Sequence, residues 1–464
     1  MKTYVTNQIK NIALVGNAGS GKTTLAETML FEGGVIDRRG DVNSKNTVSD
    51  FNQIEQENET SMYSSVMYTE YNGKKINILD VPGADDFVGG TVSSLHVADA
   101  AIILINAQNG VEVGTEIHSR WLDKLNKPAM IVINKCDHDH ANFEKTFESI
   151  KESFGGKAVL TQYPVNAGPG FDAIVDIIQM KYFKFPKDGG KPEILEIPTD
   201  ESDRAEELRN ELIEKAAEND ESLMELFFEN DTLSEDEMRK GITTGIINRG
   251  LYPIFCISSK KNMGVGLLME FITAVIPSAD ELEPAKTSDG KEIKCTMSGG
   301  TSLFVFKTSV ESHIGEINFF KVMSGELKEG MDLINVSNQG KERFSQLFAS
   351  LGKNRTKVSS LAAGDIGCSV KLKNTRTNHT LCTPDLNIKF PVIPFPEPKY
   401  RTAIKALSEG DEEKLGEALN RMHQEDPTIL VEYSKELKQI ILSGQGEYHL
   451  QIVKWHLDNV FKVS

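Results

Sequence analysis

The sequence has few cysteines, and they are scattered. Five stand at positions 136, 256, 295, 368 and 382, with no C-x-x-C spacing. Nine histidines are equally dispersed, without H-E-x-x-H or a similar metal-binding spacing. A disulfide framework or a zinc site is therefore not expected, and the composition suits a reducing cytosol. Three histidines are expected to be ordinary packing or surface residues: His96, His118 and His449.

Long apolar runs and an excess of positive charge are also missing. The longest apolar run, near residues 100–105, is far shorter than the roughly 20 residues of a membrane-spanning helix. The 51 Lys and Arg face 68 Asp and Glu, which gives a net charge of −17. Free nucleic acid is disfavoured as a ligand because its phosphates repel an acidic surface. We expect a cytoplasmic protein that does not enter membranes.

A glycine-rich motif follows the first apolar run. Residues 16–23 read GNAGSGKT, which fits the P-loop pattern G-x-x-x-x-G-K-[ST], directly after the apolar residues 12–15. A strand, a loop and then a helix is the context in which this pattern binds phosphates. We expect backbone N–H groups to face the phosphates, Lys22 to meet the β- and γ-phosphates, and Thr23 to ligate Mg²⁺.

A second motif selects the base, because a P-loop contacts only phosphates. Asn134, Lys135, Cys136 and Asp137 form NKCD after the apolar residues 130–133, at the end of a strand where open α/β sheets bind ligands. The Asp137 carboxylate can accept hydrogen bonds from guanine N1–H and its amino group, while Lys135 covers the ring. Adenine would leave this carboxylate unpaired, so the motif favours GTP over ATP.

Two further motifs complete the set. DVPG, residues 80–83, resembles the D-x-P-G turn in which the Asp holds Mg²⁺ through water and the Gly amide senses the γ-phosphate. CISSKKNMGV, residues 256–265, would support guanine from Ser258. The predicted nucleotide-binding residues are Gly16, Asn17, Ala18, Gly19, Ser20, Gly21, Lys22, Thr23, Thr24, Asp80, Asn134, Lys135, Asp137, Ser258, Ser259 and Lys260.

Three domains are expected along the chain. Up to residue 285, apolar strands alternate with helical segments, which predicts an α/β domain with an inserted lobe at about 160–250. Short alternating runs within 286–388 predict a β-barrel. Residues 389–464 predict a small α+β domain. The expected fold class is therefore multidomain, α/β followed by β and then α+β.

The chain resembles the translational GTPases, and among them most closely bacterial elongation factor G. Beyond the nucleotide motifs, the resemblance is carried by residues 162–180, by Glu425-Asp426-Pro427 and by SGQGEYHL at 443–450. It covers essentially the whole chain. It implies a P-loop GTPase domain with an inserted subdomain, a translation-factor β-barrel and a ferredoxin-like domain. It also implies GTP or GDP and Mg²⁺ as cofactors.

Two positions depart from the family where catalysis is concerned. The family's third motif normally runs D-T-P-G-H, and its His helps order the water that attacks the γ-phosphate; here Ala84 takes that place beside Gly83. Gly19 stands where the family's P-loop usually has Asp. A methyl group cannot bond water, and losing one positioned catalytic group costs about 10²–10⁴-fold in rate. We expect GTP to bind and its hydrolysis to be weak or absent.

The residues that could replace these groups are less defined. Asp85 could substitute at the catalytic position, although a carboxylate near a triphosphate is repelled, and Asp86 matches a family aspartate. In the family's first switch, FNQIEQENETSMYSS at 51–65, Ser61 aligns with the Thr that completes the Mg²⁺ shell. Thr60 is the alternative, and Glu59 stands at the family's Gly. The metal residues expected are Thr23, Ser61 and Asp80.

Acidic residues gather in one segment. Residues 193–240 hold 18 Asp and Glu against five Lys and Arg, which accounts for most of the net charge of −17. A helix-patterned acidic segment is either a solvated face or, on the resemblance, a docking surface for the ribosomal stalk. Contact with large-subunit ribosomal RNA would use basic spots such as residues 371–376.

Three functions are compatible with the sequence. The first is an elongation factor G paralogue, a monomer that binds the ribosome and moves tRNA and mRNA with hydrolysis slowed or absent. The second is a ribosome-protection or rescue factor of the same family. The third is a non-hydrolysing GTP-sensing module that needs no ribosome. Since the family continues with two more domains, we expect an N-terminal fragment rather than a natural short form.

Overall fold

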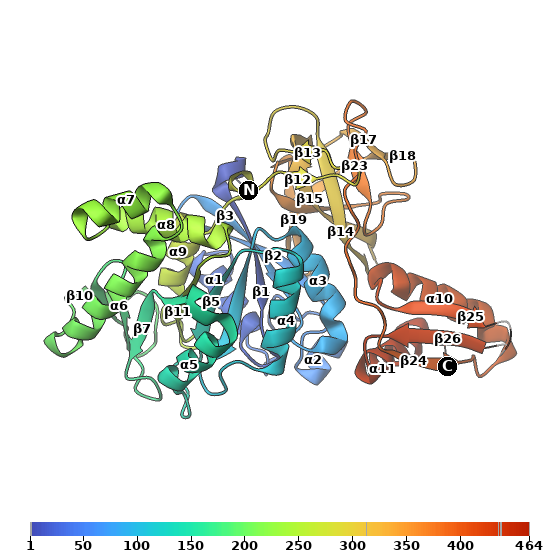
Figure 1. Ribbon diagram of the computed structural model, residues 1–464. Coiled ribbons are helices and arrows are strands. Elements are labelled where there is room, and N and C mark those ends of the chain that lie inside the picture. Colours follow the sequence, from blue (N-terminus) through green and yellow to red (C-terminus); the bar gives the residue numbers. More distant parts are fainter. Residues whose placement is uncertain (1, 312, 435, 437–438, 464) are drawn as a thin grey trace.

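The structure, a computed structural model, describes residues 2–311, 313–434, 436 and 439–463. We call residues 1–285, 286–388 and 389–464 domains I, II and III, after the boundaries predicted above. Figure 1 shows them in order along the colour bar, from blue and green through yellow to red. Among the described residues, no helix is both long and apolar enough to cross a membrane.

A seven-stranded sheet forms the centre of domain I. Its order is β2-β3-β1-β4-β5-β11-β6, and all neighbours pair in parallel except β2 and β3. The strands are β1 (Ile9–Val15), β2 (Ser65–Tyr71), β3 (Lys74–Asp80), β4 (Ala100–Asn106), β5 (Ala129–Asn134), β6 (Ala158–Leu160) and β11 (Tyr252–Cys256). Since carboxyl ends of parallel strands share one edge, β1, β3, β5 and β11 deliver all four nucleotide motifs there.

Helices cover this sheet. They are α1 (Lys22–Glu32), α2 (Gln53–Asn58), α3 (Val88–Val97), α4 (Val113–Lys124), α5 (Phe143–Phe154) and α9 (Val265–Val275), with short 3₁₀ turns η1 (Thr6–Gln8), η2 (Asp85–Phe87), η3 (Gly155–Lys157) and η4 (Ala279–Glu281). Helix α1 packs on α9, and α3 packs on α4. Strands β1, β4 and β5 are buried along their whole length, as expected of strands with both faces covered.

The inserted lobe of domain I combines a small sheet with three helices. The antiparallel order is β10-β9-β8-β7. The elements are β7 (Gln162–Val165), β8 (Ala173–Asp176), β9 (Lys181–Lys184), β10 (Glu193–Leu195), α6 (Thr199–Ala217), α7 (Glu221–Asn230) and α8 (Glu235–Ile247). The acidic segment falls on these helices, which lie at the end of the molecule away from domain III (Figure 1).

Domain II is antiparallel β structure. One sheet runs β18-β17-β23-β14-β15-β22-β19-β20, and β16-β21 and β12-β13 form separate pairs. The strands are β12 (Ala285–Lys286), β13 (Glu292–Ile293), β14 (Ser302–Glu311), β15 (Gly315–Ser324), β16 (Glu326–Lys328), β17 (Asp332–Asn335), β18 (Gly340–Arg343), β19 (Leu347–Leu351), β20 (Asn354–Val358), β21 (Ser360–Ala362), β22 (Ile366–Val370) and β23 (Thr380–Cys382). Leu303, Phe320, Leu327 and Leu361 from two of these sheets share one core, as in a barrel.

The described part of domain III contains three strands and two long helices. The sheet order is β24-β26-β25. The elements are β24 (Tyr400–Ile404), η5 (Glu409–Asp411), α10 (Glu412–Glu425), β25 (Leu430–Ser434), β26 (Gln439–Gly444), α11 (Glu447–His456) and the π-helical turn η6 (Leu457–Phe461). Leu415, Leu419, Leu442 and Val453 belong to a core of its own. The predicted fold class, α/β followed by β and α+β, is confirmed.

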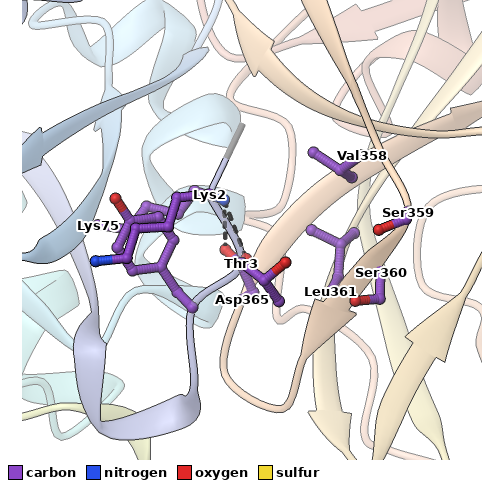
Figure 2. A pocket seen from close by; sticks show the side chains of 9 residues that line it. Lys2, Thr3, Lys75, Val358, Ser359, Ser360, Leu361 and Asp365 are labelled. Carbon is purple, nitrogen blue, oxygen red and sulfur yellow. Dashed lines mark hydrogen bonds and ion pairs between the residues drawn. The ribbon is translucent and has the colours of Figure 1, made fainter.

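Domains I and II form one packed unit. Phe304 and Phe306 of domain II belong to the same buried cluster as the sheet of domain I. Lys75 Nζ lies 2.8 Å and 3.0 Å from the two carboxylate oxygens of Asp365, and both side chains are buried. Figure 2 shows this pair in the pocket where the N-terminal residues meet domain II. A second buried ion pair joins Lys321 to Asp99.

Candidate nucleotide-binding site

The P-loop surrounds a buried lysine. Lys22 Nζ donates to Gly16 O at 2.8 Å and to Asn17 O at 2.9 Å. Burial lowers the pKa of Lys22 to about 8. Ala18 and Gly19, at the tip of the loop, are exposed. An ammonium group removed from water beside neutral carbonyls gains much from a bound anion, so this site fits a phosphate.

Three glycines allow neighbouring groups to come close to the backbone at this site. A Cβ at Gly16 would lie 2.4 Å from Leu104 O, and one at Gly21 would lie 2.3 Å from Asn134 Nδ2. A Cβ at Gly83 would lie 2.5 Å from Ala18 N and 2.7 Å from Lys22 Nζ. The DVPG turn therefore rests on the P-loop beside the lysine, where a larger residue would force both apart.

Hydroxyl and carboxylate oxygens gather beside Thr23. Thr23 Oγ1 donates to Asp80 Oδ2 at 2.8 Å, and Ser49 Oγ donates to the same oxygen at 2.6 Å. Ser61 Oγ lies 3.2 Å from Thr23 Oγ1 and donates to Asp50 Oδ1 at 2.8 Å. The structure thus brings together the three predicted metal residues, Thr23, Ser61 and Asp80, and adds Asp50.

This oxygen cluster fits Mg²⁺. Asp80 Oδ1 is buried and has no hydrogen-bond partner among the described residues. Burial raises the pKa of Asp80, and burial with the charges of Glu55 and Asp80 raises that of Asp50 to about 8. No group of three or more His, Cys, Asp and Glu side chains in the described part of the chain could hold a metal. Hydroxyls and phosphate oxygens are the ligands that Mg²⁺ takes in such sites, and there it would neutralise phosphate charge.

Asn134 ties the P-loop to the loops expected to bind guanine. Its Nδ2 donates to Ser20 O at 2.9 Å, and its Oδ1 accepts from the Ser259 N–H at 3.0 Å. The Ser258 hydroxyl accepts from the Lys261 N–H at 3.2 Å, and Lys260 O accepts from Arg39 at 2.9 Å. NKCD and the 256–265 segment lie more than a hundred residues apart in sequence, and Asn134 joins them to each other and to the P-loop.

NKCD also contributes two charged side chains beside these loops, Lys135 and Asp137. Lys135 has a φ of +64°, a left-handed conformation, at the end of β5. Burial lowers its pKa. Asp137 Oδ2 lies 3.7 Å from Lys261 Nζ, and the carboxylate is mostly shielded from solvent. A carboxylate with one distant cation retains free lone pairs for the two donors of guanine.

Ala84 lies in an apolar cluster rather than at a polar group. Its methyl group packs against the cluster of Ile54, Met62, Phe87 and Ile452, which joins the first switch, the turn after DVPG and helix α11 of domain III. The neighbouring Phe87 ring also contacts Tyr448 edge-on, with centroids 5.4 Å apart. The methyl group at position 84 is therefore partly exposed, and its buried side contacts apolar side chains.

The two aspartates after Ala84 bond to domain III. Asp85 Oδ2 accepts from Lys399 Nζ at 2.7 Å. Asp86 Oδ2 accepts from the His449 N–H at 3.1 Å, and a Cβ on Gly446 would lie 2.2 Å from it. His449 Nε2 in turn lies 2.9 Å from Asp426 Oδ2. These contacts hold both carboxylates against domain III.

Besides Asp50, two further residues of this site were not predicted from the sequence. His118 was expected to be an ordinary packing or surface residue, but its Nδ1 accepts from the Gly16 N–H of the P-loop at 2.9 Å. Glu27 of α1 is buried and accepts from the N–H groups of Gly40, at 2.8 Å, and Val48, and so holds the segment before the first switch. Neither residue lies in a motif, and only the tertiary fold brings each to its partner.

Three family descriptions match the chain. "Elongation factor Tu GTP binding domain" matches residues 7–278, "Elongation factor G domain 2" matches 301–384, and "Elongation Factor G, domain III" matches 395–464. The curated "Elongation factor G 1" of Syntrophomonas wolfei subsp. wolfei (strain DSM 2245B / Goettingen) is 33% identical over 463 residues, which cover 98% of this chain and 69% of that protein. A crystal structure of a Thermus thermophilus protein matches with a TM-score of 0.88 and 28% identity, over 99% of this chain and 67% of that one.

Proposed function

The chain belongs to the elongation factor G family of translational GTPases, and on that premise we propose that it binds GTP with Mg²⁺, acts in translocation on the ribosome, and cleaves GTP slowly or not at all. Its partners in this role are the large-subunit RNA and stalk proteins, with tRNA and mRNA moved indirectly. In this role the protein acts in the cytoplasm, which contains the ribosomes. The four nucleotide motifs that meet at one sheet edge support GTP binding.

Slow hydrolysis is supported above all by position 84. Phosphoryl transfer to water depends on positioning and electrostatics, so the attacking water needs a polar group to hold it. The Ala84 methyl instead packs with Ile54, Met62 and Phe87. A methyl group has neither a donor nor an acceptor, so it cannot orient a water molecule.

The neighbouring carboxylates do not supply the missing group. Asp85 is paired with Lys399, and Asp86 accepts a backbone hydrogen bond from His449. Moving either toward the phosphates would break a contact with domain III and bring two negative charges together. This supports the loss of catalytic power rather than its transfer to residue 85 or 86.

The test is single-turnover hydrolysis of bound GTP, with and without ribosomes, in the parent and in Ala84→His. Ala84→Asn is the matched control, because it adds a polar group of similar reach without an imidazole. We expect all three to bind GTP and ribosomes, the parent and Asn variant to stay inert, and the His variant to gain about 10²-fold or more in rate with ribosomes.

Two results would contradict this proposal. Brisk hydrolysis by the parent in the presence of ribosomes would show that another group orders the water. Tight GTP binding without any ribosome binding would instead support a GTP-sensing module.

A further inference from the structure

Helix α4 contacts the first two residues of the P-loop through two hydrogen bonds. The Gly16 N–H donates to His118 Nδ1 at 2.9 Å, and the Gly114 N–H donates to Asn17 Oδ1 at 3.0 Å. His118 is fully buried. A Cβ on Gly114 would stand 2.3 Å from Asn17 Oδ1, so only glycine permits this approach. Helix α4 therefore binds the P-loop at the Gly16 backbone and at the Asn17 side chain.

Lys22 holds the same two residues from within the loop. Its Nζ donates to Gly16 O and to Asn17 O, at 2.8 Å and 2.9 Å. Gly16 and Asn17 are thus held between α4 and the P-loop lysine. Gly19 at the tip differs, because no atom of the described residues lies within 4 Å of the place where its Cβ would be. The base of the loop is restrained from both sides, whereas the space beside Gly19 is open.

The His118 ring acts here only as an acceptor toward the loop. Because Nδ1 accepts the Gly16 N–H, the neutral ring carries its proton on Nε2. Burial, together with the charge of Lys22, lowers the pKa of His118 to about 3, so the ring stays neutral. Nε2 is buried without a hydrogen-bond partner among the described residues. An apolar ring would avoid that cost to stability.

We propose that His118 is a positioning residue of the nucleotide site, which together with Asn17 holds the base of the P-loop in its phosphate-receiving shape before the nucleotide arrives. The inference rests on the proposed GTP binding. A loop that is already ordered loses less conformational entropy on binding, so affinity rises. The contacts act on the phosphate-binding backbone and not on the base, so GDP and GTP benefit alike.

The test compares His118→Phe with the parent in stopped-flow binding of fluorescent GDP and GTP. Phenylalanine keeps a ring and removes both nitrogens. We expect the association rate constant to fall and Kd to rise about tenfold for both nucleotides. The melting temperature should stay near that of the parent, since the unpaired Nε2–H is removed along with the Gly16 acceptor. His118→Gln, which keeps an acceptor, should recover part of the affinity.

His96→Phe is the matched control. His96 is also a histidine on a helix of domain I, and burial lowers its pKa to about 3 as well. Its ring packs on Phe304 of domain II, with centroids 5.1 Å apart, so it lies at a different interface. This variant should bind both nucleotides as the parent does. Equal losses in His96→Phe and His118→Phe would overturn the proposal, because they would reflect a general loosening of domain I.

Parent-like association rates and Kd values in His118→Phe would also overturn it. If that variant does not fold, Asn17→Ala decides the question, because Asn17 is partly exposed and its amide can be removed with little disturbance of the core. We expect severalfold slower association of both nucleotides in Asn17→Ala, and an unchanged rate there would refute the proposal. A parent that binds neither nucleotide would instead refute the proposed function, so the two failures are distinguishable.

Discussion

At the scale of single residues, one hydroxyl connects the first switch to the P-loop. Ser61 Oγ lies 3.2 Å from Thr23 Oγ1 and donates to Asp50. Thr60 turns away, and its hydroxyl donates to Asn58 O at 3.0 Å. The difference follows from Glu59, whose φ of +50° ends α2 in a left-handed conformation and reverses the chain. Of the two hydroxyls, Ser61 rather than Thr60 therefore lies beside Thr23.

We predict that Ser61→Ala weakens binding of a non-hydrolysable GTP analogue by about tenfold or more in saturating Mg²⁺, because a hydroxyl near a cation and a triphosphate is lost. GDP affinity should change little. Thr60→Ala is the control and should bind both nucleotides as the parent does. Titration calorimetry measures the Kd of each nucleotide for the parent and both variants. An equal loss of affinity for GDP and for the GTP analogue in Ser61→Ala would contradict the prediction.

Residues within motifs could be predicted from sequence, and residues outside them could not. Lys22, Thr23, Asp80 and Asn134 follow buried strands in recognisable patterns, and the fold brings them to one edge. Asp50, His118 and Glu27 have no local pattern. Their positions depend on how α4 and the loop before the first switch pack onto α1 and the P-loop, which periodicity along the chain does not encode.

At the scale of elements, α10 ends where all three domains meet. Its last residue, Glu425, lines a pocket with Tyr63 of domain I and Lys307 of domain II. Part of the Glu425 side chain remains accessible, but protein surrounds most of it, and burial raises its pKa to about 7. Burial lowers the pKa of Lys307 to about 8. The junction is therefore sensitive to pH near neutrality.

We predict that Glu425→Gln stabilises the protein at pH 8 more than at pH 5. The folded state binds the Glu425 proton more tightly than the unfolded state, whose carboxyl has an ordinary pKa, so the parent loses stability as pH rises toward 7. Glutamine removes that loss and can still accept the Val310 backbone hydrogen bond. The difference between pH 5 and pH 8 should amount to about 1–3 kcal/mol in unfolding free energy. Denaturant titrations at both pH values measure it, and an equal effect at both would disprove the assignment.

Element boundaries could be predicted well where the helical period is strong. In domain III, α10 (Glu412–Glu425) has such a period, with Leu415, Leu419 and Met422 buried on one face. By contrast, β1 begins at Ile9 rather than residue 12, because its first residues are buried against neighbouring elements. The short helix α2 in the first switch was not predicted, since its six residues carry no clear apolar period.

At the scale of the whole molecule, domains I and II share one core, while most of domain III packs around a second core and contacts domains I and II through Ile452 and the segment that contains Phe390 and Ile393. Unfolding should therefore show two steps. We predict that Asp365→Asn leaves Lys75 buried without its counter-charge. The unfolding free energy of domains I and II should fall by about 3–5 kcal/mol. Differential scanning calorimetry should show the transition of domains I and II move down while that of domain III stays in place.

A paired substitution serves as the control for this prediction. Lys75→Met combined with Asp365→Asn removes both charges. The asparagine oxygen can still accept from the Ile366 N–H and from Asn77 Nδ2, so the pair should recover most of the lost stability. If the double variant is as unstable as Asp365→Asn, packing rather than the unpaired charge is responsible. A single transition in the parent would show that domain III unfolds together with the rest.

The acidic helices α6, α7 and α8 lie at the end of the molecule away from domain III (Figure 1). Their segment holds 18 acidic against five basic residues, while the remainder is nearly balanced. The centres of positive and negative charge are therefore displaced along the line that joins the lobe to domain III, which makes the molecule a large permanent electric dipole. The field of any polyanion exerts a torque on it before contact, so the lobe trails and the opposite end approaches first, at a rate that added salt reduces.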